Sequence, residues 1–333
     1  MIADAHVDLL LELAYREHRA GERGVFAATW LPLLRAGGVA LQVCPVFVEL
    51  DRQPEGSLRE ALGQAMSFRR AVSENEPDVL AVRTREDVAA AARGGKVGLM
   101  LSLEGVEPFG YEVWPAELFW ELGARMMSLT WNRRNPFADG AADEGGLSRL
   151  GRTLVDRLVE LGVILDLSHA SPGLFADVLA RSGEAPVLVS HAACRAVNDH
   201  PRNLTDDQLR ALAERGGLLG LMLHPLAIGH EQRTIARVID HLEHAASTMG
   251  LSQVCLGGDF VSRITRELPA VPSPADGLMP PGLELGSSIQ GLAGPEDYPA
   301  LVDALGERGW SKADVDAVTH GNLLRFLEGA LPA

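Results

Sequence analysis

Basic residues are scarce in this chain of 333 residues. Its 30 lysines and arginines are outnumbered by 45 aspartates and glutamates, which gives a formal net charge of −15. Nucleic acids and anionic membranes both attract basic surfaces, so this balance argues against either as a partner. Cysteines are equally few: Cys44, Cys194 and Cys255 lie far apart and form no Cys-x-x-Cys pair. A thiolate zinc site and a disulfide framework are therefore not indicated.

Long apolar runs are also missing. No stretch of about 18 residues is apolar and free of charge, which argues against a transmembrane span. The sequence begins directly with a strand-like run and shows no basic region followed by an apolar signal stretch, so we expect a cytoplasmic protein. A hydrophobic content of 47% with 23% charged residues predicts a large core rather than a disordered chain.

Short apolar runs alternate with amphipathic stretches almost from end to end. Helical patterns cover residues 58–75, 150–161, 206–215 and 235–249. Eight apolar runs joined by helical crossovers predict an α/β fold, a (β/α)8 TIM-type barrel. An open doubly wound sheet is the alternative, but the first strand-to-helix turn lacks a glycine-rich phosphate loop. The predicted strands are Ile2–Asp8, Val39–Phe47, Val97–Leu103, Met126–Trp131, Val163–Ser168, Val187–Ser190, Leu218–Leu223 and Val254–Asp259.

A single barrel domain over residues 1–333 accounts for the whole alternating pattern. Two stretches depart from it. Residues 131–146 are polar and glycine-rich, and residues 263–295 contain many prolines and glycines with little periodicity. Long irregular loops of this kind are typical of functional lids or mobile insertions. Because the second stretch follows the last strand, we expect it either to overhang the active face or to be a surface excursion.

Polar side chains gather where the predicted strands end, which is the face that carries chemistry in such barrels. Alternation along Ile2–Asp8 would place His6 and Asp8 side by side on one face of the strand. Each strand-end residue alone is more often a cap or a core residue, but three imidazoles and two carboxylates together suffice for two divalent metals if one carboxylate bridges. Glu104 is the best bridge in chain order. The strand-end group is His6, Asp8, Glu104, His169, His191 and Asp259.

The remaining histidines have weaker signals. His224 ends the seventh strand at the same rim, next to Pro225, and is a candidate substrate contact. The other six lie in helical or polar segments, where we interpret them as surface residues: His18, His200, His230, His241, His244 and His320.

The sequence resembles the membrane dipeptidase (renal dipeptidase) family of zinc metallopeptidases, in its bacterial form, among the amidohydrolase-like barrels. The resemblance covers nearly the full length, and the order and context of its segments agree. The matching segments are Asp4–Leu9, Leu103–Gly105, Leu129–Gly140, Gly162–His169, Pro186–His191, Pro201–Asp207, Gly257–Phe260 and Gly321–Arg325.

The resemblance implies a metallo-dipeptidase with two Zn²⁺ ions. It implies that His6 and Asp8 hold one ion, that His169 and His191 hold the other, and that Glu104 bridges both. Its substrates would be dipeptides with a free C-terminal carboxylate, including a C-terminal D-residue, and a homodimer is a family-based expectation.

The resemblance also implies roles outside the metal ligands. Asp259 matches the catalytic aspartate that handles the proton, and Arg202 matches the arginine that pairs with the substrate carboxylate, a task suited to the guanidinium fork. Trp131 is a departure, since the mammalian enzymes have a histidine there. An indole donates one hydrogen bond but cannot bind a metal, which leaves substrate range and oxyanion stabilisation open.

Two other functions stay open. Amidohydrolase-type barrels that act on lactones or phosphotriesters usually bridge their metals with a carboxylated lysine, but Lys96 and Lys312 are the only lysines and neither ends a predicted strand. A catalytically silent metal-binding barrel is the second alternative, and the complete ligand set with Asp259 argues against it.

Overall fold

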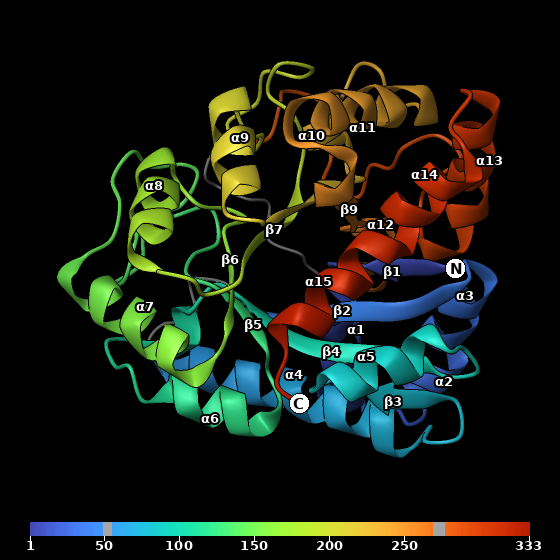
Figure 1. The fold of residues 1–333 in the computed structure, drawn as a ribbon. Helices are drawn as coiled ribbons and strands as arrows, with labels where there is room; N and C mark the ends of the chain where they lie inside the picture. The colour runs from blue at the N-terminus through green and yellow to red at the C-terminus, as the bar shows by residue number, and fades with distance from the viewer. Residues whose placement is uncertain (49–54, 269–276) are drawn as a thin grey trace.

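Eight parallel strands close into a barrel in the computed structural model, which describes residues 1–48, 55–268 and 277–333. The ring runs β2-β1-β9-β8-β7-β6-β5-β4, and pairing between β2 and β4 closes it (Figure 1). A ninth described strand, β3, pairs with the beginning of β4 outside this ring. The predicted barrel is therefore confirmed. The strands are β1 Ile2–Asp4, β2 Val39–Phe47, β3 Val79–Ala81, β4 Val97–Glu104, β5 Met126–Ser128, β6 Ile164–Asp166, β7 Val187–Ala192, β8 Leu218–Met222 and β9 Val254–Gly257.

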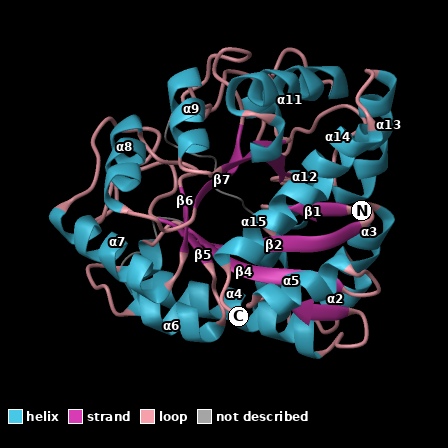
Figure 2. Ribbon diagram, in the orientation of Figure 1, coloured by secondary structure: helices cyan, strands magenta, loops and turns pink. Residues whose placement is uncertain are grey.

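Helices surround the strands on the outside, as Figure 2 shows. The four predicted helices are present as α4, α7, α9 and α11, and α11 has the predicted bounds. The α-helices of the described residues are α1 Leu9–Ala14, α2 Val25–Ala28, α3 Trp30–Ala36, α4 Glu55–Ser73, α5 Arg85–Ala92, α6 Pro115–Leu122, α7 Arg149–Leu161, α8 Pro172–Arg181, α9 Asp206–Glu214, α10 Pro225–Ile228, α11 Ile235–Met249, α12 Ser262–Glu267, α13 Tyr298–Glu307, α14 Lys312–Asp316 and α15 Asn322–Ala330.

The helix boundaries follow from local side-chain chemistry. Thr205 begins α9 with a capping box, in which its hydroxyl accepts from the Gln208 N–H and the Gln208 side chain accepts from the Thr205 N–H. Gly162 ends α7 in the left-handed conformation, with φ of 76°, which a residue without a Cβ adopts at little cost. These caps fix where each crossover returns to the barrel.

The barrel is buried on both faces, which explains its continuous apolar strands. Every residue of β2 and β4 is buried. Near the starts of the strands, Met100, Met126 and Ile164 form one apolar cluster with leucines of α15. Helix α15 therefore covers the amino-terminal end of the barrel, and the opposite end is left for the site.

Several predicted strands are too long. Strand β1 ends at Asp4, β6 at Asp166 and β9 at Gly257, so strand alternation does not explain how His6 lies near Asp8. The chain leaves the sheet in tight turns instead, and His169 and Asp259 have positive φ angles of 63° and 48°. Strand β3 was not predicted, because three residues carry too little pattern.

The structure describes residues 263–268 and 277–295 of the irregular stretch 263–295. Helix α12, Ser262–Glu267, occupies its beginning, while residues 269–276 of the predicted loop lie outside the described residues. Its later part packs over the carboxyl end of the barrel, where Leu278 O and Leu285 O accept from the ring nitrogens of His200 and His224. The assignment of one domain to the whole chain stays a prediction. None of the helices in the described ranges combines the length and apolarity needed to cross a membrane.

Candidate metal centre

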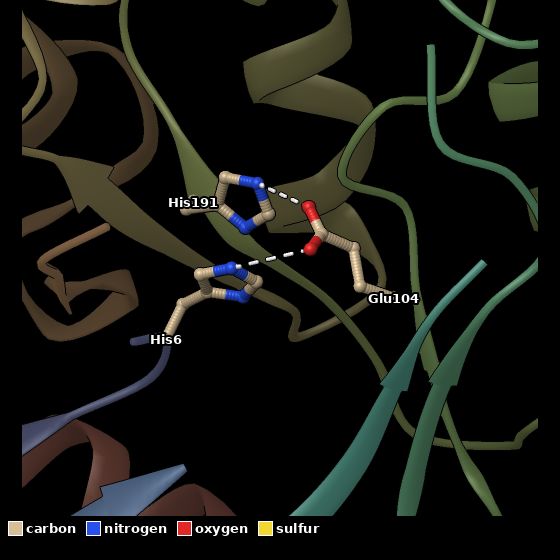
Figure 3. A group of neighbouring side chains, drawn as sticks. All are labelled: His6, Glu104 and His191. Atoms are coloured by element: carbon tan, nitrogen blue, oxygen red, sulfur yellow. Dashed lines mark ion pairs between the residues drawn. The ribbon is translucent and has the colours of Figure 1, made fainter. Parts of the chain in front are cut away.

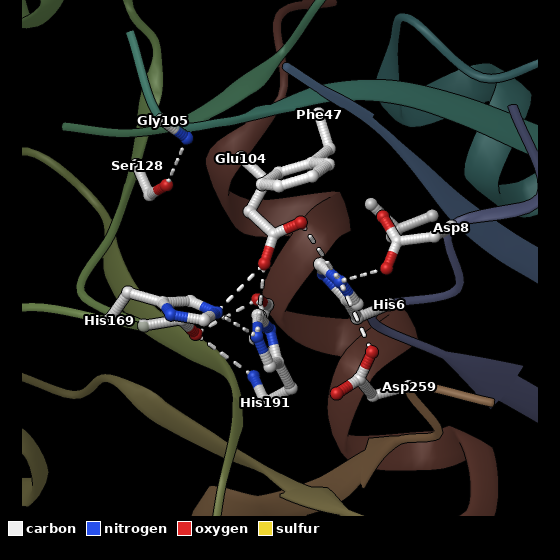
Figure 4. A network of polar contacts seen from close by, with 12 residues as sticks. His6, Asp8, Phe47, Glu104, Gly105, Ser128, His169, His191 and Asp259 are labelled. Atoms are coloured by element: carbon white, nitrogen blue, oxygen red, sulfur yellow. Dashed lines mark hydrogen bonds and ion pairs between the residues drawn. The ribbon is translucent and has the colours of Figure 1, made fainter. Parts of the chain in front are cut away.

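The six predicted strand-end side chains converge at the carboxyl end of the barrel (Figure 4). They come from five different strands or the turns that follow them, and every one of them is buried. Glu104 is the last residue of β4, His191 lies within β7, and Asp8 stands at the N-cap of α1. The other three follow strands within three residues: His6 after β1, His169 after β6 and Asp259 after β9.

Glu104 lies between two sets of nitrogen atoms. Its Oε1 is 2.8 Å from His169 Nε2 and 3.4 Å from His191 Nε2. Its Oε2 points the other way, 3.7 Å from His6 Nε2. Figure 3 shows one carboxylate oxygen facing each imidazole. This is the arrangement that a bridging carboxylate requires.

His6 also faces two further carboxylates. Its Nε2 is 3.7 Å from Asp8 Oδ2 and 3.9 Å from Asp259 Oδ1. The ligand atoms of His6, Asp8 and Asp259 therefore lie close enough to hold one ion, and those of His6, Glu104 and His191 satisfy the same condition. The two groups share His6.

Two buried aspartates at strand ends fix the backbone around these side chains. Asp4 Oδ1 accepts from the N–H groups of His6 and Gly258, at 3.0 and 2.8 Å. Its Oδ2 accepts from the hydroxyl of Tyr298 at 2.7 Å. Asp4 thus ties the turn after β1 to the turn after β9 that carries Asp259.

Asp166 does the same on the other side of the barrel. Its Oδ1 accepts from the N–H groups of Ser168 and Ser190, both at 2.9 Å. Ser168 and Ser190 directly precede His169 and His191 in the sequence. Asp166 thus ties the turn after β6 to strand β7. A strand-end carboxylate that joins two neighbouring segments therefore supports both halves of the site.

The electrostatics of the cluster favour a cation. Burial disfavours a charged His6, but the neighbouring carboxylates, Glu104 first, outweigh it and raise the pKa of His6 to about 10. Burial and the charge of Asp8 raise the pKa of Glu104 well above its usual range. Both effects have one physical origin, the concentration of carboxylates in a place with little solvent. Such a place stabilises positive charge.

His169 and His191 also favour a cation, because both are neutral imidazoles. Burial, together with the nearby positive charges of Arg202 and His6, lowers the pKa of both well below the ordinary value, so both rings are neutral. The Nδ1 of His169 donates to Asn132 Oδ1 at 2.6 Å, which leaves a lone pair on Nε2. That Nε2 lies 2.8 Å from His191 Nε2.

A divalent metal fits these residues. In addition to the facing ring nitrogens, His6 Nε2 and Asp8 Oδ1 are buried and have no hydrogen-bond partner within the described part of the chain. Buried polar atoms without partners are costly unless a ligand satisfies them. Imidazole nitrogens with carboxylate oxygens are the donor set that zinc takes in catalytic sites.

The pocket beside the cluster contains the three predicted substrate contacts. Arg202, Trp131 and His224 all line it, together with apolar side chains such as Met222 and Leu285. Arg202 is 4% exposed, and its guanidinium donates to His191 O at 3.5 Å. His224 uses both ring nitrogens within the protein, since Nδ1 accepts from the Leu226 N–H and Nε2 donates to Leu285 O.

Trp131 forms an aromatic wall of this pocket. Its ring centroid lies 5.1 Å from that of Phe47 and 5.9 Å from that of His169. The indole is thus next to the candidate ligands without supplying one.

The residues that hold the candidate ligands in place were not predicted from the sequence. Asn132 lies in the irregular segment after β5, where nothing in the local sequence indicates that its amide meets His169. Asp4 and Asp166 had a detectable signal, because each precedes a candidate histidine by two or three residues at the end of an apolar run. The interpretation of His200 and His241 as surface residues was wrong, since they are 7% and 0% exposed.

Comparison with known proteins gives the class of this one. Residues 1–271 match the sequence model described as membrane dipeptidase (peptidase family M19), so with its barrel and its candidate metal centre the protein is a metallopeptidase, a hydrolase that acts on peptide bonds. The match covers most of the chain. The chain belongs to the membrane dipeptidase family.

Individual proteins similar to this chain are named dipeptidases. The chain is 30% identical over 331 residues to Dipeptidase aclJ of Aspergillus oryzae, covering 94% of this chain and 72% of the fungal protein. It is 29% identical over 309 residues to Dipeptidase 3 of Rattus norvegicus, with 89% of this chain covered; it spans 57% of the length of the rat protein.

Solved structures extend the likeness to the whole fold. Dipeptidase AC, a metallo peptidase of family M19, superposes with a TM-score of 0.86 at 26% identity, covering 100% of this chain and 99% of that one. A metallo peptidase from Rhodobacter sphaeroides gives a TM-score of 0.85 at 25% identity, covering 99% of each chain. That structure is liganded with a phosphinate mimic of the dipeptide L-Ala-D-Ala.

Proposed function

We propose that this protein hydrolyses dipeptides that have a free C-terminal carboxylate, using two zinc ions. His6 and Asp8 would hold one ion, His169 and His191 would hold the other, and Glu104 would be shared by both. The observation that carries the proposal is the position of Glu104, whose Oε1 faces His169 and His191 while its Oε2 faces His6. When bound, a pair of divalent ions makes water nucleophilic at neutral pH and polarises a carbonyl, as peptide hydrolysis requires.

Asp259 is the proton carrier in this proposal. Burial raises the pKa of its carboxyl to about 6, in the range where a group exchanges protons efficiently near neutrality. Its Oδ1 faces the cluster, 3.9 Å from His6 Nε2. The carboxylate takes a proton from the attacking water and delivers it to the leaving amine, so that one group serves both halves of the reaction.

Arg202 selects the substrate class. Its buried guanidinium lines the same pocket as Glu104 and Asp259, and a guanidinium fork binds a carboxylate with two parallel hydrogen bonds. A carboxylate held there brings the C-terminal peptide bond of the substrate to the cluster, and in a dipeptide this is the only peptide bond.

The walls of the pocket suit the rest of the dipeptide. Phe47 and Trp131 present aromatic faces on one side, and Trp131 substitutes apolar contact for the histidine of the mammalian enzymes. The dipeptide mimic bound by the Rhodobacter sphaeroides metallo peptidase ends in D-Ala, which supports the extension of the substrate range to a C-terminal D-residue. Further proposals are a homodimer and His224 as a substrate contact.

A dipeptide library tests the proposal. Purified protein loaded with zinc is incubated with L-L and L-D dipeptides, with and without a chelator, and released amino acids are quantified. We expect release that the chelator abolishes and added zinc restores. Turnover of lactones or phosphotriesters but not of dipeptides would favour a different amidohydrolase-type enzyme. Absence of any turnover by zinc-loaded protein would favour a silent metal-binding barrel and overturn the proposal.

A further inference from the structure

A chain of buried polar groups leads away from the metal centre behind His191. His191 Nδ1 lies 2.9 Å from Ser190 Oγ, and Ser190 Oγ lies 2.6 Å from Asp166 Oδ2. Asp166, Ser190 and His191 are 4%, 0% and 0% exposed. Water therefore has little access to this chain, and its hydrogen bonds must be satisfied internally.

The direction of each hydrogen bond follows from a count of protons. An ionised carboxylate only accepts, and a serine hydroxyl has one proton, so Ser190 donates its proton to Asp166. The Ser190 oxygen then accepts, and it has two neighbours that can donate: the Ser168 hydroxyl at 3.0 Å and His191 Nδ1 at 2.9 Å. His191 Nδ1 faces the Ser190 oxygen, whose proton is already donated to Asp166. Nδ1 therefore acts as the donor and carries the imidazole proton, which leaves a lone pair on Nε2.

We propose that Asp166 is a positioning residue that acts through the Ser190 hydroxyl to hold His191 with its Nε2 lone pair aimed at Glu104. This inference rests on the proposed function, because it takes His191 as a metal ligand. His191 Nε2 lies 3.4 Å from Glu104 Oε1, and a ring protonated on Nε2 cannot bind a metal there. Outer partners that fix a ligating histidine in this way typically account for 10- to 100-fold in metal affinity.

The chain offers a substitution that reverses the direction of the hydrogen bonds while preserving its shape. In Asp166→Asn, the amide oxygen must remain where Oδ1 accepts from two backbone N–H groups. The amide NH2 then faces Ser190 and donates to it. The Ser168 hydroxyl still donates to Ser190, so Ser190 turns its own proton toward His191 Nδ1. The imidazole proton then moves to Nε2, which removes the lone pair from the metal side.

Ser190→Ala tests the middle of the chain, since it leaves His191 Nδ1 without its acceptor. Ser102→Ala is the matched control. Ser102 is also a buried serine of a barrel strand, in β4, two residues before Glu104, and its hydroxyl has no hydrogen-bond partner in the described ranges. The control removes the same atom from the same kind of place without touching a polar chain.

The experiment has two readouts. The first is zinc affinity by competition with a chromogenic chelator. The second is the tautomer of His191 in metal-free protein, from long-range proton–nitrogen spectra of histidine-labelled protein, with the signal assigned by its loss in His191→Gln. We expect zinc affinity to fall by roughly 10- to 100-fold in Asp166→Asn and Ser190→Ala, and to be unchanged in Ser102→Ala. The His191 proton should move from Nδ1 to Nε2 in Asp166→Asn.

Unchanged affinity in both variants would overturn the inference, and so would an Nε2 proton in the wild-type protein. A loss of affinity with His191 still protonated on Nδ1 in Asp166→Asn would show a merely structural role and would also overturn it. Neither readout uses turnover. A wild-type protein without dipeptidase activity would therefore refute the proposed function. Zinc affinity and the His191 tautomer would still test the role of Asp166.

Discussion

His241 ties the segment after β7 to helix α10 beside the substrate pocket, and we expect this residue to make the protein sensitive to acid. It lies in α11 and is fully buried. Its Nδ1 accepts from the N–H of Cys194 at 3.1 Å, in the segment after β7 that leads to Arg202. Its Nε2 donates to Ile228 O at 3.0 Å, at the end of α10. Only the neutral ring can make both bonds, because an imidazolium has no acceptor.

The size of the effect follows from the pKa of His241. Burial lowers it from 6.5 to about 4. As the pH falls below 6.5 the unfolded chain takes up the proton before the folded protein does, so stability is complete above that value and is lost between there and about pH 4. The whole difference corresponds to about 3.4 kcal/mol. A change from about pH 7.5 to about pH 5.5 removes about 1.3 kcal/mol of it.

Urea unfolding of the wild-type protein and of His241→Gln measures this contribution. Glutamine retains a donor and an acceptor but does not titrate. With a chelator present throughout, so that metal release does not enter, we expect the free energy of unfolding of the wild type to decrease relative to the variant by about 1.3 kcal/mol between about pH 7.5 and about pH 5.5. Two results would contradict this expectation: the two proteins differ in free energy of unfolding by the same amount at both pH values, or the wild type gains stability over the variant in acid. Either result would show that burial of neutral His241 does not weaken the wild type in acid.

Three substitutions test the site itself. Glu104→Gln removes charge from the residue that faces both nitrogen sets, and zinc titration should show a loss of affinity beyond the roughly 10- to 100-fold typical of an outer partner; wild-type affinity would exclude Glu104 as a ligand. Arg202→Met should lower kcat/KM for a dipeptide by about 10- to 100-fold, the value of a charged hydrogen bond of 1.5–3 kcal/mol, while hydrolysis of the matching dipeptide amide changes little; equal losses on both substrates would argue against carboxylate recognition. Asp259→Asn should reduce kcat by about 100- to 10,000-fold with metal content intact by elemental analysis, and an active, fully metallated variant would rule out its role in proton transfer.

The barrel was predictable because its strands are buried on both faces. Runs such as Val39–Phe47 and Val97–Leu103 are mostly apolar for that reason, and the polar residues at their carboxyl ends stand out. The site was predictable on the same basis, since Glu104, His169 and His191 each close such a run. Resemblance to a family then added Arg202, which no local pattern distinguishes, and the proton-carrying role of Asp259.

The structural features that were not predicted depend on contacts between segments far apart in the sequence. The first strand was predicted too long, because the chain turns out of the sheet after Asp4. Asp4 Oδ1 accepts from the His6 N–H and from the Gly258 N–H in the turn after β9. Asn132 meets His169 across 37 positions of sequence. His241 was misjudged although the pattern held a clue, since it lies on the apolar face of α11 with Val238 and Leu242.

We propose that the protein hydrolyses dipeptides in this pocket with two metal ions bound around Glu104. The most direct test of this proposal is a stepwise zinc titration of metal-free protein, with bound zinc and dipeptide hydrolysis measured at every step. We expect the full rate only when about two equivalents of zinc are bound, as a two-metal site requires. A full rate with one equivalent, or no hydrolysis with two equivalents bound, would contradict it.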